Sequence, residues 1–217
     1  MTITTRTKRI LEKEMEMAIS ENRDYRAFVS FEARAAEKKE DEEYIVEGYA
    51  TTFDDPYVLY DDGTYRINEQ ISKNAFDEAD MSDVLFLYNH EGRVYARQKN
   101  GSLELTVDKK GLHVKANLGL TEEARKMYED IKAGLIDQMS WAFTVKEDSW
   151  DRETHTRTIT KVRKVYDVSA VSYPANPSTE ISARSYADGV ISAEEAERLK
   201  NEQKMALARK KYEYLEG

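Results

Sequence analysis

Residues able to carry out covalent chemistry are few in this chain. It contains three histidines and no cysteine, so cysteine nucleophiles and thiolate zinc sites are excluded. Of the histidines, His90 ends the most apolar segment, residues 84–90, and is followed by Glu91 and Gly92. At such a position a buried strand delivers a polar side chain to the rim of a domain. A histidine there could take up and return a proton near neutral pH.

Two further polar side chains lie within apolar segments and need partners. Ser140 stands between two large apolar residues, and a hydrogen bond to a neighbouring strand would satisfy its hydroxyl as well as a histidine would. Asp167 lies in the apolar segment 165–171, where an unpaired carboxylate would be costly to bury. The spacing allows, without requiring, a set in which Ser140 is the nucleophile, His90 the base and Asp167 the orienting group.

The other two histidines are predicted to have no catalytic role. His113 lies between Leu112 and Val114 in a predicted hairpin, so it should face solvent or pack beside the core. His155 lies in the polar stretch 150–156. Metal-binding spacings such as H-x-x-x-H or H-E-x-x-H do not occur, and no Gly-rich loop precedes a helix. We therefore expect neither a metal nor a cofactor.

Composition narrows the class of partner. The formal net charge is -9, and a negative field repels the phosphates of nucleic acid and of anionic lipid. No segment approaches the roughly 18 apolar residues of a membrane-spanning helix. We therefore expect no nucleic acid and no membrane as partners, and a protein partner instead.

Charge also divides the chain, because both ends are more densely charged than the middle. We predict a charged N-terminal arm (1–43), a core domain (44–184) and a charged helical C-terminal arm (185–217). In the last, Ser192 followed by Glu195 is typical of a capping box and predicts a helix that begins there. Exposed arms are also the easiest substrates for cleavage.

Inside the core domain apolar residues recur mainly at every second position, as they do in strands. Met139, Trp141, Phe143 and Val145 alternate with small residues and predict a strand with one large-residue face. Further strands are expected at 44–50, 84–90 and 159–171, a hairpin at 103–107 and 112–116, a helical turn at 72–76, and a helix capped by Thr121 that ends at Lys132. Residues 146–157 are predicted to form a long polar hairpin tip. This pattern indicates an α+β fold with a largely antiparallel sheet and, as one form of it, a barrel.

Several ordered motifs carry a family resemblance over about residues 44–184. They are Glu47 to Phe53, Lys73 to Phe76, Leu87 to Glu91, Gly134 to Phe143 with Ser140 inside it, and Tyr166 to Pro177. Together they resemble the tailed-bacteriophage prohead (head maturation) proteases, distant relatives of the herpesvirus assemblins. The resemblance implies a small, mostly antiparallel β-barrel with surrounding helices and a serine endopeptidase without a cofactor.

By matching residues, the resemblance places the base on His90 and the nucleophile on Ser140. The third position is Asp167, where this family often has Glu and the herpesvirus relatives have His, so His155 is the alternative third member. The implied substrates are the major capsid protein with its scaffold segment and the protease itself. The implied location is the host cytoplasm and then the interior of the immature capsid, and a homodimer is left open.

Self-cleavage is expected within or near residues 178–190, with a second site before Tyr44. Two alternatives to a peptidase also remain: a catalytically silent scaffolding protein of the prohead with the same fold, and an esterase acting on non-peptide substrates.

Overall fold

Within the part of the chain that the structure describes, the fold consists of two sheets and two α-helices. The computed structural model describes residues 23–29, 31–32, 44–172 and 177–216. The larger sheet contains β1 (Asp24–Val29), β10 (Gln138–Asp151), β11 (Thr156–Val171), β5 (Arg66–Ile71), β4 (Tyr57–Asp61), β6 (Leu85–Tyr88) and β7 (Glu91–Arg97). The smaller sheet contains β2 (Phe31–Glu32), β3 (Ile45–Thr52), β9 (Gly111–Asn117) and β8 (Leu103–Val107). The helices are α2 (Glu122–Lys132) and α3 (Pro177–Glu216), and a 3-10 turn, η1 (Gln98–Asn100), follows β7.

The α+β class is confirmed, and most strand pairings in the described residues are antiparallel. The predicted barrel is wrong, because the two sheets are not closed into one. The reason lies in β11, which is 16 residues long. One edge of β11 pairs with β10, while the other edge pairs in parallel with β5 near its start and with β6 near its end. The larger sheet therefore branches instead of closing.

The hydrophobic core lies against the large-residue face of β10. Met139, Trp141, Phe143 and Val145 are all buried in the main apolar cluster, as their alternation predicts. The rings of Trp141 and Phe143 stack with their centroids 3.8 Å apart. Strands β3 and β9 contribute apolar side chains to the same cluster. Full burial of side chains of this size stabilises a fold by about 1.5–3 kcal/mol each.

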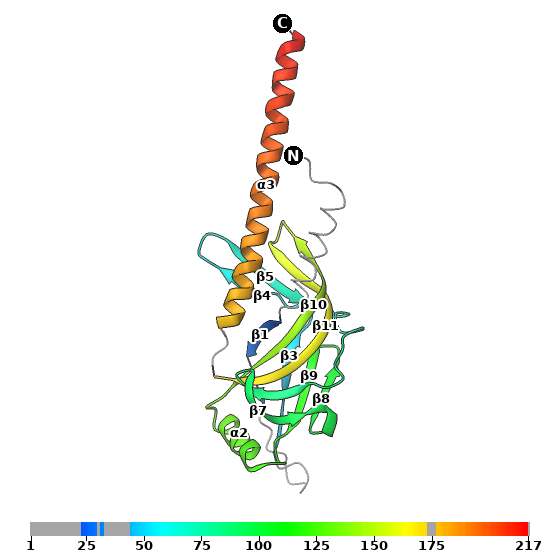
Figure 1. Cartoon of the computed structure of the whole chain (residues 1–217), viewed down its shortest axis with the longest axis vertical. Coiled ribbons are helices and arrows are strands. Elements are labelled where there is room, and N and C mark those ends of the chain that lie inside the picture. Colours follow the sequence, from blue (N-terminus) through cyan, green and yellow to red (C-terminus); the bar gives the residue numbers. More distant parts are fainter. Residues whose placement is uncertain (1–22, 30, 33–43, 173–176, 217) are drawn as a thin grey trace.

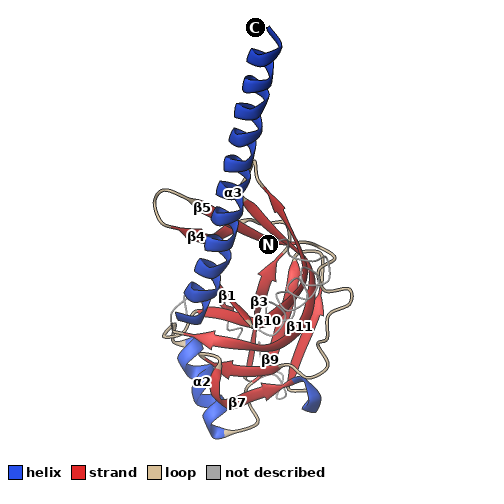
Figure 2. Cartoon of the chain, turned by 45° about the horizontal axis from the view of Figure 1, so that its top comes forward, coloured by secondary structure: helices blue, strands red, loops and turns tan. Residues whose placement is uncertain are grey.

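Two local predictions are confirmed. Strands β8 and β9 form the expected hairpin. Helix α2 begins after Thr121, whose hydroxyl accepts a hydrogen bond from the backbone N–H of Ala124 at 3.1 Å. Its buried face consists of Ala124, Met127, Tyr128 and Ile131, and the helix lies beside β7 (Figure 2). The expected turn at 72–76 is present as backbone hydrogen bonds from Ala75 to Ser72 and from Asp77 to Asn74.

Other segments differ from the predictions. The predicted polar tip at 146–157 is mostly strand, because β10 continues to Asp151 and β11 begins at Thr156. Exposed ladders tolerate polar residues, and the ion pair between Glu147 and Lys161 joins these two strands. The hairpin of β4 and β5 was not predicted. Strand β1 lies within the predicted N-terminal arm, most of which is outside the described residues.

Helix α3 begins at Pro177, not at Ser192 as predicted. Proline suits the first turn of a helix, and the following residues contain no further proline to interrupt it. Its first half packs on the larger sheet, with Ala187 buried and Tyr186 over the guanidinium of Arg157 at 4.2 Å, while its second half extends away from the sheets (Figure 1). No helix in the described part of the chain is long and apolar enough to cross a membrane.

Candidate active site

Three neighbouring strands of the larger sheet bring the chemically interesting residues together. In the register of β10 and β11, Ser140 lies opposite Ser169 and Ala142 opposite Asp167. Side chains two residues apart share a face of a strand, so Ser140 and Asp167 lie on the same face. Strand β6 continues this register on the other edge of β11 and ends two residues before His90. The small-residue face of β10 leaves room beside Asp167 for the histidine.

His90 lies in a strained turn that places it beside Ser140 and Asp167. Strands β6 and β7 are joined by Asn89 and His90 alone, whose φ angles are 50° and 62°. Two residues with positive φ form the tight turn that suits the twist of a hairpin, and glycine is usually preferred at the second position. Histidine there is strained, and such strain is typical of functional sites. The side-chain oxygen of Asn89 accepts a hydrogen bond from the backbone N–H of Ser172 at 3.1 Å, which anchors the turn to the end of β11.

The three side chains form one chain of hydrogen bonds. His90 Nδ1 lies 2.6 Å from Asp167 Oδ1, and His90 Nε2 lies 2.7 Å from Ser140 Oγ. A carboxylate only accepts hydrogen bonds, so Nδ1 carries a proton, and in the neutral imidazole Nε2 is then the acceptor for the Ser140 hydroxyl. This is the tautomer in which an imidazole can take a proton from a serine. The sequence could not decide between this arrangement and a hydrogen bond from Ser140 to a neighbouring strand.

A fourth residue, Ser169, holds the carboxylate. Its hydroxyl donates to Asp167 Oδ1 at 2.8 Å, the same oxygen that accepts from His90, and its side chain is fully buried. A β-bulge lies beside Asp167, since Ala142 pairs with Asp167 whereas Phe143 pairs with Val165. Bulges reorient side chains next to active sites. Ser169 was not predicted, although its spacing of two from Asp167 on one strand was a usable signal.

The site is closed to solvent. Ser140 is 3% exposed, and the side chains of His90 and Asp167 are 2% and 5% exposed. The ring of Tyr25, on β1, meets the His90 ring edge to face with centroids 4.7 Å apart. Tyr25 was also not predicted, because it falls in the segment assigned to the N-terminal arm.

A second buried polar cluster lies near the first but differs in composition. Glu69 on β5 accepts hydrogen bonds from Arg26 on β1, from Arg157 on β11 at 2.9 Å, and from the Tyr57 hydroxyl at 2.5 Å. Burial opposes the charge of Glu69, but attraction to Arg26 and Arg157 outweighs it and lowers the pKa of this carboxyl to about 2. Glu69 is therefore a paired anion throughout the physiological pH range.

The remaining histidines lie elsewhere. His113 packs against Tyr49, with ring centroids 5.1 Å apart, between the buried Leu112 and Val114, as predicted. His155 stacks on Tyr65 at 4.7 Å at the tip of the β10–β11 hairpin. The His155 ring is thus held against the Tyr65 ring, away from His90. The contacts of His90 therefore favour Asp167 over His155 as the partner of His90.

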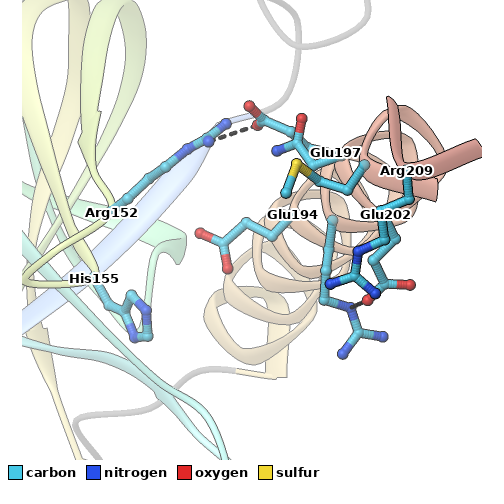
Figure 3. Close-up of a pocket in the computed structure, with 9 residues that line it drawn as sticks. Arg152, His155, Glu194, Glu197, Glu202 and Arg209 are labelled. Carbon is cyan, nitrogen blue, oxygen red and sulfur yellow. Dashed lines mark ion pairs between the residues drawn. The ribbon is translucent and has the colours of Figure 1, made fainter. Parts of the chain in front are cut away.

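A pocket of about 610 Å³ lies between this hairpin tip and α3 (Figure 3). Its lining includes Arg152, His155, Glu194 and Glu197 but no residue of the Ser140 cluster. Arg152 pairs with Glu197 across it at 2.5 Å, so it marks where α3 docks. Nowhere in the described residues, this pocket included, does a cluster of three or more histidine, aspartate or glutamate side chains form a group that could hold a metal ion.

Comparison with known proteins agrees with the geometry. No curated protein and no solved structure matches the chain significantly. The model of one protein family, described as caudovirus prohead serine protease, matches residues 29–190. That match covers most of the chain and contains His90, Ser140 and Asp167. The chain therefore belongs to the caudovirus prohead serine protease family.

Proposed function

We propose that this chain is a serine endopeptidase that cleaves the scaffold segment and precursors of the capsid protein, and also itself, inside the immature phage capsid. One observation supports this most directly: Ser140, His90 and Asp167 form a continuous hydrogen-bonded chain in a member of a serine protease family. Family membership supports a role in the prohead and a substrate related to the capsid.

The proposed mechanism is acyl transfer. His90 Nε2 takes the proton of Ser140 as Oγ attacks the peptide carbonyl carbon, and Asp167 stabilises the imidazolium that forms. The imidazolium then protonates the leaving amine as the peptide C–N bond breaks, which leaves an acyl ester on Ser140. Water, deprotonated by His90, attacks this ester, and the proton returns to Ser140 as the carboxylic product leaves. Ser169 keeps Asp167 turned toward His90 during these steps.

The test is co-expression of the protease with its capsid precursor, followed by mass spectrometry of the fragment termini. The parent should yield defined new termini, and Ser140→Ala should yield none. An uncleaved precursor with the parent protein, folded and incorporated in shells, would favour the silent scaffolding protein. Turnover of small esters without cleavage of polypeptides would favour an esterase.

We further propose that self-cleavage occurs outside residues 178–190. Residues 178–190 lie within α3, where a peptidase would first have to unfold a helix. The second predicted site, before Tyr44, falls in residues outside the described part of the chain. We therefore place self-cleavage before Tyr44.

We also propose that the outer half of α3 docks the protease on capsid or scaffold helices. Leu199, Met205 and Leu207 are exposed there, and exposed apolar side chains of a helix can dock on partner helices. Removal of residues 186–217 would also remove Tyr186 and the buried Ala187, which pack on the sheet. Truncation after Arg198 is the cleaner variant: it should keep peptidase activity and reduce incorporation into shells, measured by protease content of purified proheads.

A further inference from the structure

A buried nucleophile raises the question of how a polypeptide reaches it. Attack requires the carbonyl carbon to approach the nucleophile to about 3–3.5 Å. Ser140 is only 3% exposed, and the side chain of its base, His90, is 2% exposed. An element that covers the site must therefore move before a peptide can enter.

Strand β1 is the element best placed to move. Strand β10 lies between β11, which carries Asp167, and β1, which ends the sheet and, among the described residues, pairs with β10 alone. In this pairing Ala27 lies directly opposite Ser140. Tyr25, also on β1, places its ring against the ring of His90. Loss of β11 would dismantle the site, whereas loss of β1 would uncover it.

Strand β1 also occupies its place in the manner of a bound peptide. It is extended and antiparallel to β10 over Gln138 to Phe143. Peptides are commonly recognised by adding a strand to an open sheet edge, and opposite residues in such a pair lie about 4.5–5.5 Å apart between Cα atoms. A peptide in the position of β1 would therefore present its main chain to Ser140.

We infer that the edge of β10 from Gln138 to Phe143 is the peptide-binding strand of this site, and that β1 occupies it until an extended substrate polypeptide replaces it. The inference rests on the proposed function of Ser140 as nucleophile and adds both the place where substrate binds and the way in which the site is restrained. Main-chain pairing gives affinity, and the substrate side chains that fall beside His90 and Ser140 give specificity.

The attachment of β1 is compatible with its release. Arg26 holds β1 through Glu69, but Glu69 also keeps Arg157 at 2.9 Å and Tyr57 at 2.5 Å. Departure of Arg26 therefore leaves no unpaired buried carboxylate, which would be the most costly outcome. The family match begins at residue 29, the last residue of β1. A cut before Tyr44 would separate β1 from the strands that carry the proposed catalytic residues.

A reversible crosslink tests the inference on the full chain. Val29 and Gln138 are register partners in β1 and β10, so Val29→Cys with Gln138→Cys is suited to a disulfide between the strands. The parent chain has no cysteine, so this pair is unique. We expect the oxidised variant to cleave fluorescein-labelled casein at close to the background rate. Reduction with dithiothreitol should restore the rate of the double variant that was never oxidised.

A matched disulfide serves as the control. Glu104 and Lys115 are register partners in β8 and β9 of the other sheet, so Glu104→Cys with Lys115→Cys should cleave casein equally well oxidised and reduced. Equal rates for the oxidised and reduced β1–β10 variant would overturn the inference while leaving the proposed function intact. A parent protein that cleaves neither casein nor its own precursor would instead remove the proposed function.

Hydrogen exchange gives a readout that does not need catalysis. In Ser140→Ala with excess unfolded casein, amides of residues 24–29 should exchange faster, while those of residues 138–143 stay protected by the peptide that replaces β1. Binding of casein with unchanged exchange in β1 would contradict the inference.

Discussion

Two buried polar clusters lie in the same sheet, and they are built in opposite ways. Around Ser140 a hydroxyl is hydrogen-bonded to an imidazole that can take its proton, and one carboxylate orients that imidazole. Around Glu69 two guanidinium groups and a phenol surround one carboxylate that stays charged. The first cluster includes a strained turn at His90. The second is a saturated ion cluster between strands, so burial of charge alone does not mark an active site.

Removal of the reacting groups should produce the largest effect. Ser140→Ala and His90→Ala should each lower kcat/KM on the order of 10⁵- to 10⁶-fold, and the double variant should be barely worse, because the two groups act as a unit. Steady-state cleavage of a precursor peptide measures this. Ser149→Ala, at an exposed position on the same strand, is the matched control and should keep parental activity. Additive losses in the double variant would contradict a joint role.

Neutralising the orienting group should be the next largest effect. Asp167→Asn should lower kcat about 10⁴-fold and leave measurable turnover, since the imidazole loses its orienting charge and its preferred tautomer. His155→Ala, away from the cluster, should retain parental kcat in the same assay. The reverse result would assign the third position to His155.

A substitution in the Glu69 cluster should change the stability of the fold. Glu69→Gln should lower the free energy of unfolding at pH 7 on the order of 3 kcal/mol, from the lowered pKa of about 2. Because that pKa lies below the ordinary value of 4.5, the stabilisation is full above about pH 4.5 and is lost as pH falls toward 2. Urea unfolding of parent and variant at several pH values should show their difference shrinking over this range. A constant difference would contradict the ion-pair explanation.

Two substitutions at Ser169 distinguish the contribution of a hydroxyl group to kcat from the contribution of side-chain shape. Valine and threonine have the same shape, but only threonine can donate to Asp167. Ser169→Val should lower kcat about tenfold relative to Ser169→Thr, equivalent to about 1.4 kcal/mol, with similar KM values. Equal kcat values for the two variants would mean that Ser169 only fills space.

The smallest effect concerns backbone strain at His90. His90→Gly and His90→Ala both remove the imidazole, but at a φ of 62° only glycine is unstrained. The glycine variant should be more stable by about 1 kcal/mol, measured by thermal unfolding, while both variants are inactive. Equal stability of the two would show that the turn relaxes without the histidine.

Local elements could be predicted from sequence because their signals are local. The cap at Thr121 and the large-residue face of β10 depend on neighbours a few residues away. The branching of the larger sheet could not be predicted, because it depends on two short strands, β5 and β6, that pair with one long strand from far along the chain. Strand β1 was missed for a related reason: its charged Asp24 and Arg26 are typical of a solvated arm until Glu69 is placed beside them.

The sequence by itself determined which residues could react and that each needed a partner: Ser140 and Asp167 lie in apolar strands, and His90 ends another. It could not determine that they meet, since hydrogen bonds across strands depend on register, and a slip of one residue would turn Ser140 to the opposite face. Only the tertiary structure decided that β1 covers the site. This covering depends on the pairing of β1 with β10, two segments more than a hundred residues apart, which no local pattern encodes.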